Sequence, residues 1–457
     1  MIECLFSLLR NAVTKKQNSA EAVKLESIIE QVLDYAKAEG ASSAEADIGA
    51  GEGLSVTVRL GELETIEHQR DKGLGITVYM GQRKGSSSTT DFGSEAIKAS
   101  VHAACTIAKN ASSDKYSGLI APEYIAKELP ALDLHHPWNI SAEAAIDLAI
   151  DCETIARNAD SRITNADGTA VNSYSGKHVY GNSHGFIGGW EWSSHSIDCT
   201  VIADENGMQR DGWYSKARCA DDLETPKSIG EKAAQRTVAR LGARKLSTRK
   251  APVLFEAPVA SGLFSAFIGA IAGGSLYRKA SFMLNKLDEQ VFIKDMHIYE
   301  DPHVPRGMGS APFDSDGMAT QRRNLVSDGV LQSYILSAYS ARKLGMTPTG
   351  NAGGVRNLFI KPGSQGLDEL ITSMHTGLLV TDMIGFGVNQ VTGDYSRGAS
   401  GFWVENGEIQ YPVEEITVAG NLLEMYMQIA AVGSDVDARG NTRTGSVLIE
   451  NMTVAGE

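Results

Sequence analysis

The densest group of residues that could do chemistry lies between positions 297 and 316. It contains two imidazoles and four carboxylates, which are ligands that divalent metals accept, so a metal-dependent hydrolase could use them. However, prolines and glycines place the segment in an irregular loop, and its spacing matches no common metal motif. We therefore favour a polar loop between strands. The six residues are His297, Glu300, Asp301, His303, Asp314 and Asp316.

A second candidate is the glycine-rich segment GNAGGVRNLFIKPG, which starts at residue 350. Glycines that lead into a strand let another backbone approach closely, and an arginine can donate to a carboxylate. Main-chain hydrogen bonds of this kind suit an extended peptide. A turn that simply needs glycine is an equal alternative. The candidate peptide contacts are Asn351, Gly353, Gly354 and Arg356.

Signatures of other catalytic sites are absent from the sequence. It has no G-x-S-x-G, no P-loop, no G-x-G-x-x-G after a strand and no H-E-x-x-H. The LHHP segment at 134–137 is expected in a surface loop. His178, His184 and His195 fall within strand patterns, where we expect packed or hydrogen-bonded groups rather than ligands.

The composition argues against a nucleic-acid binder. The 457 residues carry a net charge of -14, whereas a sequence-independent binder needs a basic face. The densest basic run, RLGARKLSTRK at 240–250, is interpreted as an exposed connector. Five cysteines without a C-x-x-C pair indicate a reduced, cytoplasmic protein. We expect neither a signal peptide nor a membrane-spanning segment.

The pattern of apolar residues predicts an α+β protein. A helix is predicted by one apolar stripe at helical spacing, and Gly40 is its expected stop. Alternation over 54–92 then predicts an antiparallel meander, and further strands and helices, one of them starting at Ser141, complete an N-terminal α/β domain, residues 1–245. The stripe consists of Leu25, Ile28, Ile29, Val32, Leu33 and Ala36. Short strands joined by Asp-Gly and Asn-Gly turns predict a mostly β, barrel-like C-terminal domain with packed helices, residues 246–457.

The C-terminal domain includes the least polar long stretch, FEAPVASGLFSAFIGAIAGGSLYRKASF at 255–282. Its glycines, alanines and serines permit close helix packing, while its large side chains can fill a core. We expect a structural helix whose core-facing residues are Leu263, Phe264, Phe267, Ile268 and Ile271.

This stretch, together with FDSDGMATQRRNLVSDGVLQSYILSAYSARKLGMTPTGNAGG, VTGDYSRGASGFWVENGEI and RTGSVLIENMTVAG, resembles the PmbA (TldE) branch of the TldD/PmbA metalloprotease family. The resemblance runs from about residue 25 to the C-terminus. It implies a cytosolic bacterial zinc metalloprotease of two related subunits, also described as a modulator of DNA gyrase. Implied substrates are small or unfolded polypeptides, including peptide-antibiotic precursors and an antitoxin.

The resemblance also implies where zinc would be bound. TldD-type sequences carry H-E-x-x-x-H on this helix, shortly before an Arg-Lys pair, and a cysteine near the C-terminus. Alignment on Arg278-Lys279 places Ser265, Ala266 and Ala270 at the His, Glu and His positions. All five cysteines lie before residue 220. We therefore expect no catalytic residue, no metal and no cofactor in this chain, and zinc in a TldD-type partner subunit.

Two alternatives remain open beside this non-zinc subunit of a heterodimer. The chain could be a self-contained hydrolase that uses the 297–316 loop, or a binding protein for a toxin, an antitoxin or gyrase without a proteolytic role. The expected partners are a TldD-type subunit and unfolded peptides, with no membrane and no direct nucleic acid. A homodimer is expected to be possible when the chain is alone.

Overall fold

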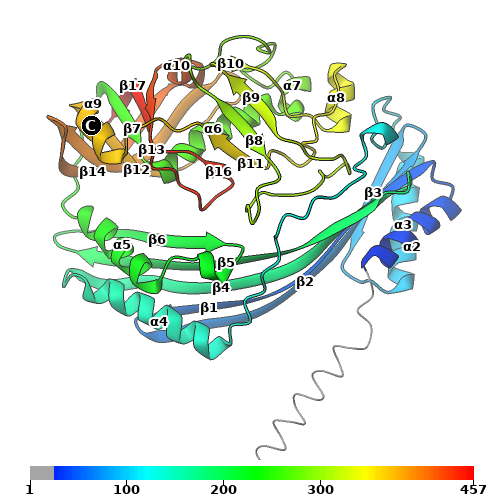
Figure 1. Ribbon diagram of the computed structural model, residues 1–457, viewed down its shortest axis with the longest axis horizontal. Helices are drawn as coiled ribbons and strands as arrows, with labels where there is room; N and C mark the ends of the chain where they lie inside the picture. Colours follow the sequence, from blue (N-terminus) through cyan, green and yellow to red (C-terminus); the bar gives the residue numbers. More distant parts are fainter. Residues whose placement is uncertain (1–24, 457) are drawn as a thin grey trace, which may run out of the picture. The chain divides into compact units, whose positions relative to one another are not determined.

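The computed structural model describes residues 25–456, which divide into two compact units. The first consists of residues 25–50, 71–119 and 177–190, and the second of residues 51–70, 120–176 and 191–456. Long strands of one six-stranded sheet contribute residues to both units (Figure 1).

This sheet has the strand order β3-β2-β1-β4-β5-β6, so the first three strands form the predicted meander. The pairs β2–β3 and β5–β6 are antiparallel. The strands are β1 (Ser43–Arg59), β2 (Glu62–Met80), β3 (Arg83–Thr89), β4 (Ile163–Asn182), β5 (Ile187–Asp204) and β6 (Met208–Ala217).

In the first unit, helices α2 (Leu25–Ala38) and α3 (Ser94–Asn110) share one hydrophobic core with strands of the sheet. Five of the six predicted core-facing residues of α2 are buried, and Leu33 packs against the core from its margin. Gly40 follows α2 with φ of 87°, a conformation that favours glycine, so the predicted helix stop is confirmed.

In the second unit, helices α4 (Ala142–Asn158) and α5 (Pro226–Ala239) pack on the sheet through alternate residues of β1, β4 and β5. Ser141 accepts a hydrogen bond from the Ala144 N–H and caps α4, as predicted. Two short 3₁₀ turns, η1 (Pro122–Tyr124) and η2 (Ala220–Asp222), lie in the connections.

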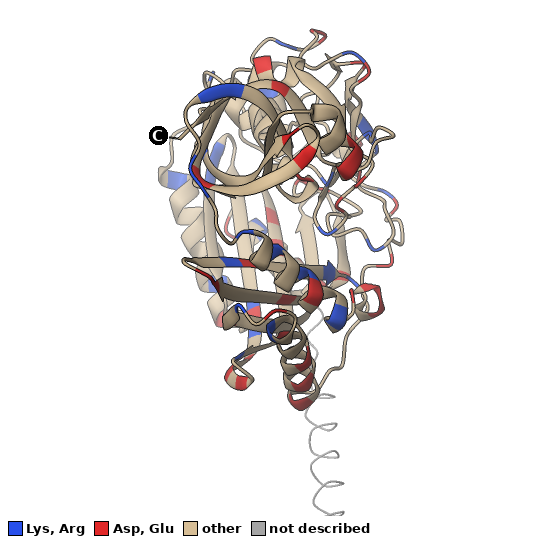
Figure 2. Ribbon diagram, turned by 90° about the vertical axis from the view of Figure 1, so that its left-hand side faces the viewer, with Lys and Arg blue, Asp and Glu red and all other residues tan. Residues whose placement is uncertain are grey.

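The C-terminal part is built on the strand order β14-β13-β12-β7-β17-β15, in which β14 also pairs with β17. This pairing closes five strands into a barrel, seen as a ring near the top of Figure 2, so the predicted barrel-like domain is confirmed. The strands are β7 (Arg249–Phe255), β12 (Gly377–Ile384), β13 (Asp394–Glu405), β14 (Glu408–Asn421), β15 (Ile429–Val432) and β17 (Val447–Ala455).

A second sheet in this part has the order β10-β9-β8-β11-β16. Two hairpin turns are those that the sequence predicted: Asp328-Gly329 joins β9 to β10, and Asn406-Gly407 joins β13 to β14, all with positive φ. The strands are β8 (Ile298–Asp301), β9 (Arg323–Ser327), β10 (Val330–Leu331), β11 (Asn357–Ile360) and β16 (Thr442–Arg443).

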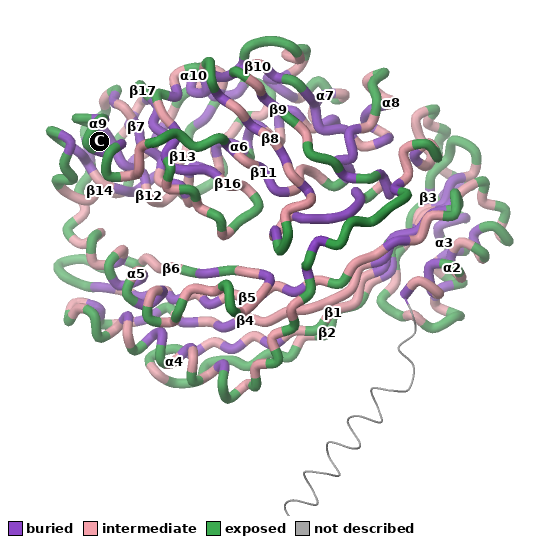
Figure 3. The backbone as a smooth tube through the Cα atoms, viewed as in Figure 1, coloured by how far each residue is buried: buried purple, intermediate pink, exposed green. Residues whose placement is uncertain are grey.

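Five helices pack in the C-terminal part: α6 (Ala257–Ile271), α7 (Gly273–Tyr277), α8 (Ala338–Leu344), α9 (Leu367–Met374) and α10 (Leu422–Met427). The largest core cluster surrounds α6, where buried residues are dense (Figure 3). Across residues 25–456, every helix is too short or too polar to cross a bilayer.

Most of the basic run 240–250 is exposed, as we expected for a connector, but several of its cations have partners. The Arg240 side chain is only 14% exposed and lies 3.5 Å from Asp211 and 3.4 Å from Asp382. Lys245 pairs with Glu415 at 2.9 Å. The run is therefore not a free basic patch, and acidic and basic residues are interspersed along the ribbon in Figure 2.

Candidate functional site on helix α6

Aromatic contacts hold helix α6 in the core. The Phe267 ring meets Phe292 edge-on, with 5.0 Å between centroids, and Tyr426 at 6.2 Å. The Tyr426 hydroxyl donates to the carbonyl oxygen of Leu263 at 2.9 Å. A buried hydroxyl needs such a partner, so this bond fixes how α6 is rotated. The same bond therefore also fixes the direction in which the opposite face of α6 points.

The positions where the family resemblance places zinc ligands carry no metal-binding side chain. Ser265 is exposed, and its hydroxyl donates within the helix at 3.0 Å. Ala266 and Ala270 are buried, and only their carbonyl oxygens meet polar partners. The Gln390 amide donates to the first carbonyl at 3.3 Å, and the Ser281 hydroxyl donates to the second at 2.6 Å.

Two long side chains, Gln390 from the β12–β13 connection and Arg397 of β13, lie beside this face of α6. A Cβ atom built on Gly269 would lie 3.1 Å from the Gln390 amide nitrogen, and one built on Gly262 would lie 3.5 Å from the Arg397 guanidinium. The guanidinium also donates to the backbone carbonyl of Gly385 at 3.0 Å. An amide and a cation therefore line the helix around positions 262–269.

These groups do not fit a zinc ion. Protein zinc sites use thiolate, imidazole or carboxylate ligands, whereas alanine methyl groups have no lone pair and the Arg397 cation would repel the metal. Within the described residues, 25–456, no three His, Cys, Asp or Glu side chains are grouped so that they could hold a metal. The groups around helix α6 therefore do not provide ligands for a metal-dependent catalytic step.

Helix α6 ends earlier than the apolar stretch does. Ala272 is extended, with φ of -70° and ψ of 133°, and the chain restarts as α7. The Gly273 N–H donates to the Ile335 carbonyl at 2.8 Å, and a side chain at Gly273 would collide with Ser340. The Arg278-Lys279 pair therefore follows a second helix rather than lying on α6.

The two histidines of the 297–316 segment contact different partners and do not meet at one common site. His297 Nε2 lies 3.3 Å from the Asp328 carboxylate, in the β9–β10 turn. His303 Nε2 lies 3.0 Å from the Thr320 hydroxyl. Since each imidazole has a separate partner, the contacts favour a polar segment over a metal site. The irregular loop that we expected is wrong for Glu300 and Asp301, which lie in strand β8.

The buried carboxylates of the 297–316 segment are held by amide donors. Glu300 accepts from the Asn351 amide nitrogen at 2.7 and 2.9 Å, and from the Arg356 backbone N–H at 3.2 Å. Burial raises the pKa of Glu300, and these donors oppose the rise. Asp314 accepts three backbone N–H groups, each at 2.9 Å. Burial, together with the charge of Asp316, raises the pKa of Asp314 to about 6.

The raised pKa of Asp314 predicts a pH-dependent contribution to stability. Its ordinary value is 3.8, so the folded state binds the proton more tightly than the unfolded state does. The contribution is fully present below about pH 4 and is lost as the pH rises to about 6. We expect Asp314→Asn to remove this pH-dependent loss of stability. The loss is on the order of 1–3 kcal/mol in the free energy of unfolding.

Urea unfolding at several values between pH 4 and 7 measures this effect. Asp34→Asn, on the exposed side of α2, is the matched control and should keep the wild-type slope. An unchanged slope in Asp314→Asn would contradict the prediction.

The structure places the predicted peptide contacts of the 350–356 loop in two groups. Asn351 is buried and directed at Glu300, and Arg356 contributes a backbone donor to the same carboxylate. Gly353 and Gly354 have φ of 89° and 107°, and Gly353 is exposed. Only the glycines offer backbone at the surface, and peptide contact at this loop stays a prediction.

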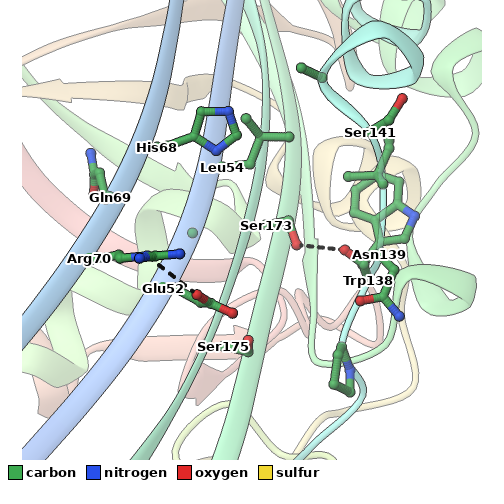
Figure 4. Close-up of a pocket in the computed structure, with 14 residues that line it drawn as sticks. Glu52, Leu54, His68, Gln69, Arg70, Trp138, Asn139, Ser141, Ser173 and Ser175 are labelled. Atoms are coloured by element: carbon green, nitrogen blue, oxygen red, sulfur yellow. Dashed lines mark hydrogen bonds and ion pairs between the residues drawn. The ribbon is translucent and has the colours of Figure 1, made fainter. Parts of the chain in front are cut away.

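A cavity of about 470 Å³ opens beside β1, β2, β4 and the segment that leads into α4 (Figure 4). Trp138 forms part of its lining, and the Ser173 hydroxyl donates to the Trp138 carbonyl at 3.2 Å. Glu52 and Arg70 form an exposed ion pair at 3.7 Å. Because Ser141 caps α4, two of the hydroxyls serve the local structure, and the cavity suits binding rather than nucleophilic catalysis. No sequence signal marked it, since four separate segments contribute.

Comparison with protein families and known structures gives a consistent result. Models of the PmbA/TldA metallopeptidase family match the chain as domain 1 over residues 44–108, as the central domain over 135–241 and as the C-terminal domain over 248–456. Metalloprotease PmbA of Escherichia coli O157:H7 is 47% identical over 442 residues, which cover 96% of this chain and 98% of that protein.

Solved structures share the fold. A candidate modulator of DNA gyrase from Bacteroides thetaiotaomicron superimposes with a TM-score of 0.90 at 27% identity, covering 95% of this chain and 100% of that one. TldE from Thermococcus kodakarensis superimposes with a TM-score of 0.82 at 21% identity, covering 94% and 100%. On these matches, the chain belongs to the PmbA/TldA metallopeptidase family.

Proposed function

We propose that this chain is the zinc-free subunit of a two-chain metalloprotease whose TldD-type partner supplies the metal. The observation that carries the proposal is the donor set of α6, where Ser265, Ala266 and Ala270 offer neither a zinc ligand nor a general base. The helix is nevertheless packed into the largest core of the chain. Its structure is retained without metal chemistry, which suits a subunit that shapes the enclosure around a shared substrate.

The proposed substrates are small or unfolded polypeptides, such as peptide-antibiotic precursors and antitoxins. The proposed compartment is the cytoplasm, because Cys105, Cys152 and Cys199 are free thiols, which persist under reducing conditions. This assignment does not require contact with DNA, and the acidic net charge of -14 agrees with that.

The test is a reconstitution experiment with metal analysis. The purified chain is expected to hold no stoichiometric zinc and to cleave no unfolded peptide, because it lacks the ligands that would activate a water molecule. Addition of the TldD-type partner is expected to give cleavage. The partner alone is the reference, and it should cleave less than the mixture. Stoichiometric zinc together with cleavage in the lone chain would overturn the proposal.

Two variants sharpen this experiment. Ser265→Ala should support the partner as well as the wild-type chain does, since the serine hydroxyl bonds only within α6. The double variant His297→Ala with His303→Ala should also retain reconstituted cleavage. Loss of cleavage in the double variant would instead favour a hydrolase that uses the 297–316 loop.

A further inference from the structure

A cavity of about 590 Å³ lies between α5 and the outer face of the barrel. Its floor is a row of apolar neighbours on adjacent strands: Leu379 of β12 is paired with Phe402 of β13, and Phe402 is paired with Pro412 of β14. Ile409 also lines the cavity and is 48% exposed. The volume falls within the range of about 300–1,000 Å³ that small ligand sites occupy.

Helix α5 closes the cavity with residues at positions i, i+3, i+4 and i+7, which share one helical face. The two cations among them are paired, Lys232 with Glu224 at 2.7 Å and Arg236 with Glu256 at 2.9 Å. A charged ligand would find no free counter-ion there, and burying its charge unpaired would be costly. The four residues are Lys232, Gln235, Arg236 and Ala239.

The edge of β14 also borders the cavity. Residues 409–412 line it consecutively, although successive strand residues face opposite sides of a sheet, so the backbone itself is exposed to the cavity. At this edge the Pro412 carbonyl accepts from the Arg244 N–H at 3.0 Å, and β17 pairs with β14 only from Thr417 onward. Among residues 25–456, β13 alone pairs with the stretch 408–411.

We infer that this cavity binds one apolar side chain of an extended polypeptide whose backbone pairs with β14 at residues 408–411. An open strand edge supplies main-chain hydrogen bonds to any sequence, and an adjacent pocket selects one side chain. The inference rests on the proposed function only in naming an unfolded polypeptide as the ligand. It gives that ligand a preference for an aliphatic or aromatic residue.

The experiment measures binding to the chain without its partner. The probe is a fluorescently labelled ten-residue peptide of Gly, Ser and Thr with one central Leu, and its reference carries Ala instead. Anisotropy is expected to show at least tenfold tighter binding of the Leu peptide, since burying one such side chain contributes about 1.5–3 kcal/mol and about 1.4 kcal/mol is tenfold.

Ala239→Trp should abolish this preference, because it fills the cavity from an exposed helix position. Glu231→Trp, on the same helix but outside the cavity, is the matched control and should keep it. Methylation of the peptide nitrogen next to Leu should weaken binding about tenfold if the backbones pair, and methylation at the peptide's terminus should not.

Equal affinity for the Leu and Ala peptides, or a preference that survives in Ala239→Trp, would overturn the inference. Binding of a free hydrophobic dye in the cavity, without binding of the Leu peptide, would also overturn the inference. The two proposals can fail separately. Leu-dependent binding without reconstituted cleavage rejects only the proposed function, whereas cleavage without Leu-dependent binding rejects only this site.

Discussion

Replacement of Phe267 by alanine is expected to lower the free energy of unfolding by about 3–5 kcal/mol. The side chain is fully buried and contacts the rings of Phe292 and Tyr426. The substitution removes these contacts and leaves a cavity, which the close-packed core around it can fill only partly. Chemical denaturation followed by circular dichroism measures the change.

Ser265→Ala on the same helix is the control for Phe267→Ala. The serine is exposed and bonds only within α6, so its loss should change the free energy of unfolding by less than about 0.5 kcal/mol. Similar losses in the free energy of unfolding from both substitutions would mean that the two faces of α6 do not differ in how much their packing stabilises the protein.

Removal of Arg236 is expected to have the second largest effect, about 2–4 kcal/mol of stability. Its guanidinium lies 2.9 Å from Glu256 and 3.6 Å from Asp211, and the Arg236 and Glu256 side chains are only 20% and 15% exposed. Burial lowers the pKa of Arg236, but the two carboxylates outweigh burial and leave the pKa raised. Arg236→Ala would leave Glu256 mostly buried without its cation, while Asp211 would keep only Arg240, at 3.5 Å.

A double-mutant cycle tests this explanation. Glu256→Gln removes one negative charge, so the pair Arg236→Ala with Glu256→Gln should cost at least 1 kcal/mol less than the sum of the single changes, within the range of about 0.5–3 kcal/mol typical of contacting residues. Additive losses would show that the ion pair is not the source of the effect. Because Glu256 precedes α6, the same pair also joins α5 to the start of that helix.

Local pattern predicted the elements whose partners are near in sequence. The apolar stripe of α2 depends only on one helix packing against one face of a sheet. The stop at Gly40 depends on a local backbone conformation that glycine adopts easily. The turns at Asp328-Gly329 and Asn406-Gly407 depend on backbone conformations that few residues adopt. The barrel-like domain was also predictable, since several short apolar strands with tight turns need a closed or layered arrangement.

Features that depend on distant contacts were not predictable. The break at Ala272 is set by the Ile335 carbonyl and the Ser340 side chain. Gly273-Gly274 follows it directly in the sequence, but a glycine pair does not by itself show which distant groups the chain meets there. The cavity under α5 combines residues from α5 with others near position 400. For α6, the meaning of Ser265, Ala266 and Ala270 came from the family resemblance, since small residues on a helix indicate only close packing.

The six-stranded sheet has a consequence for synthesis of the protein. Strand β1 lies between β2 and β4, and Arg59 reaches the carbonyl of Ala166, 107 positions later. A ribosome adds about 5–20 residues per second, so β1 waits on the order of 5–20 s before that neighbour exists. Meanwhile its edge is open to strands of other nascent chains. The rate of translation therefore determines how long the edge of β1 stays unpaired during synthesis.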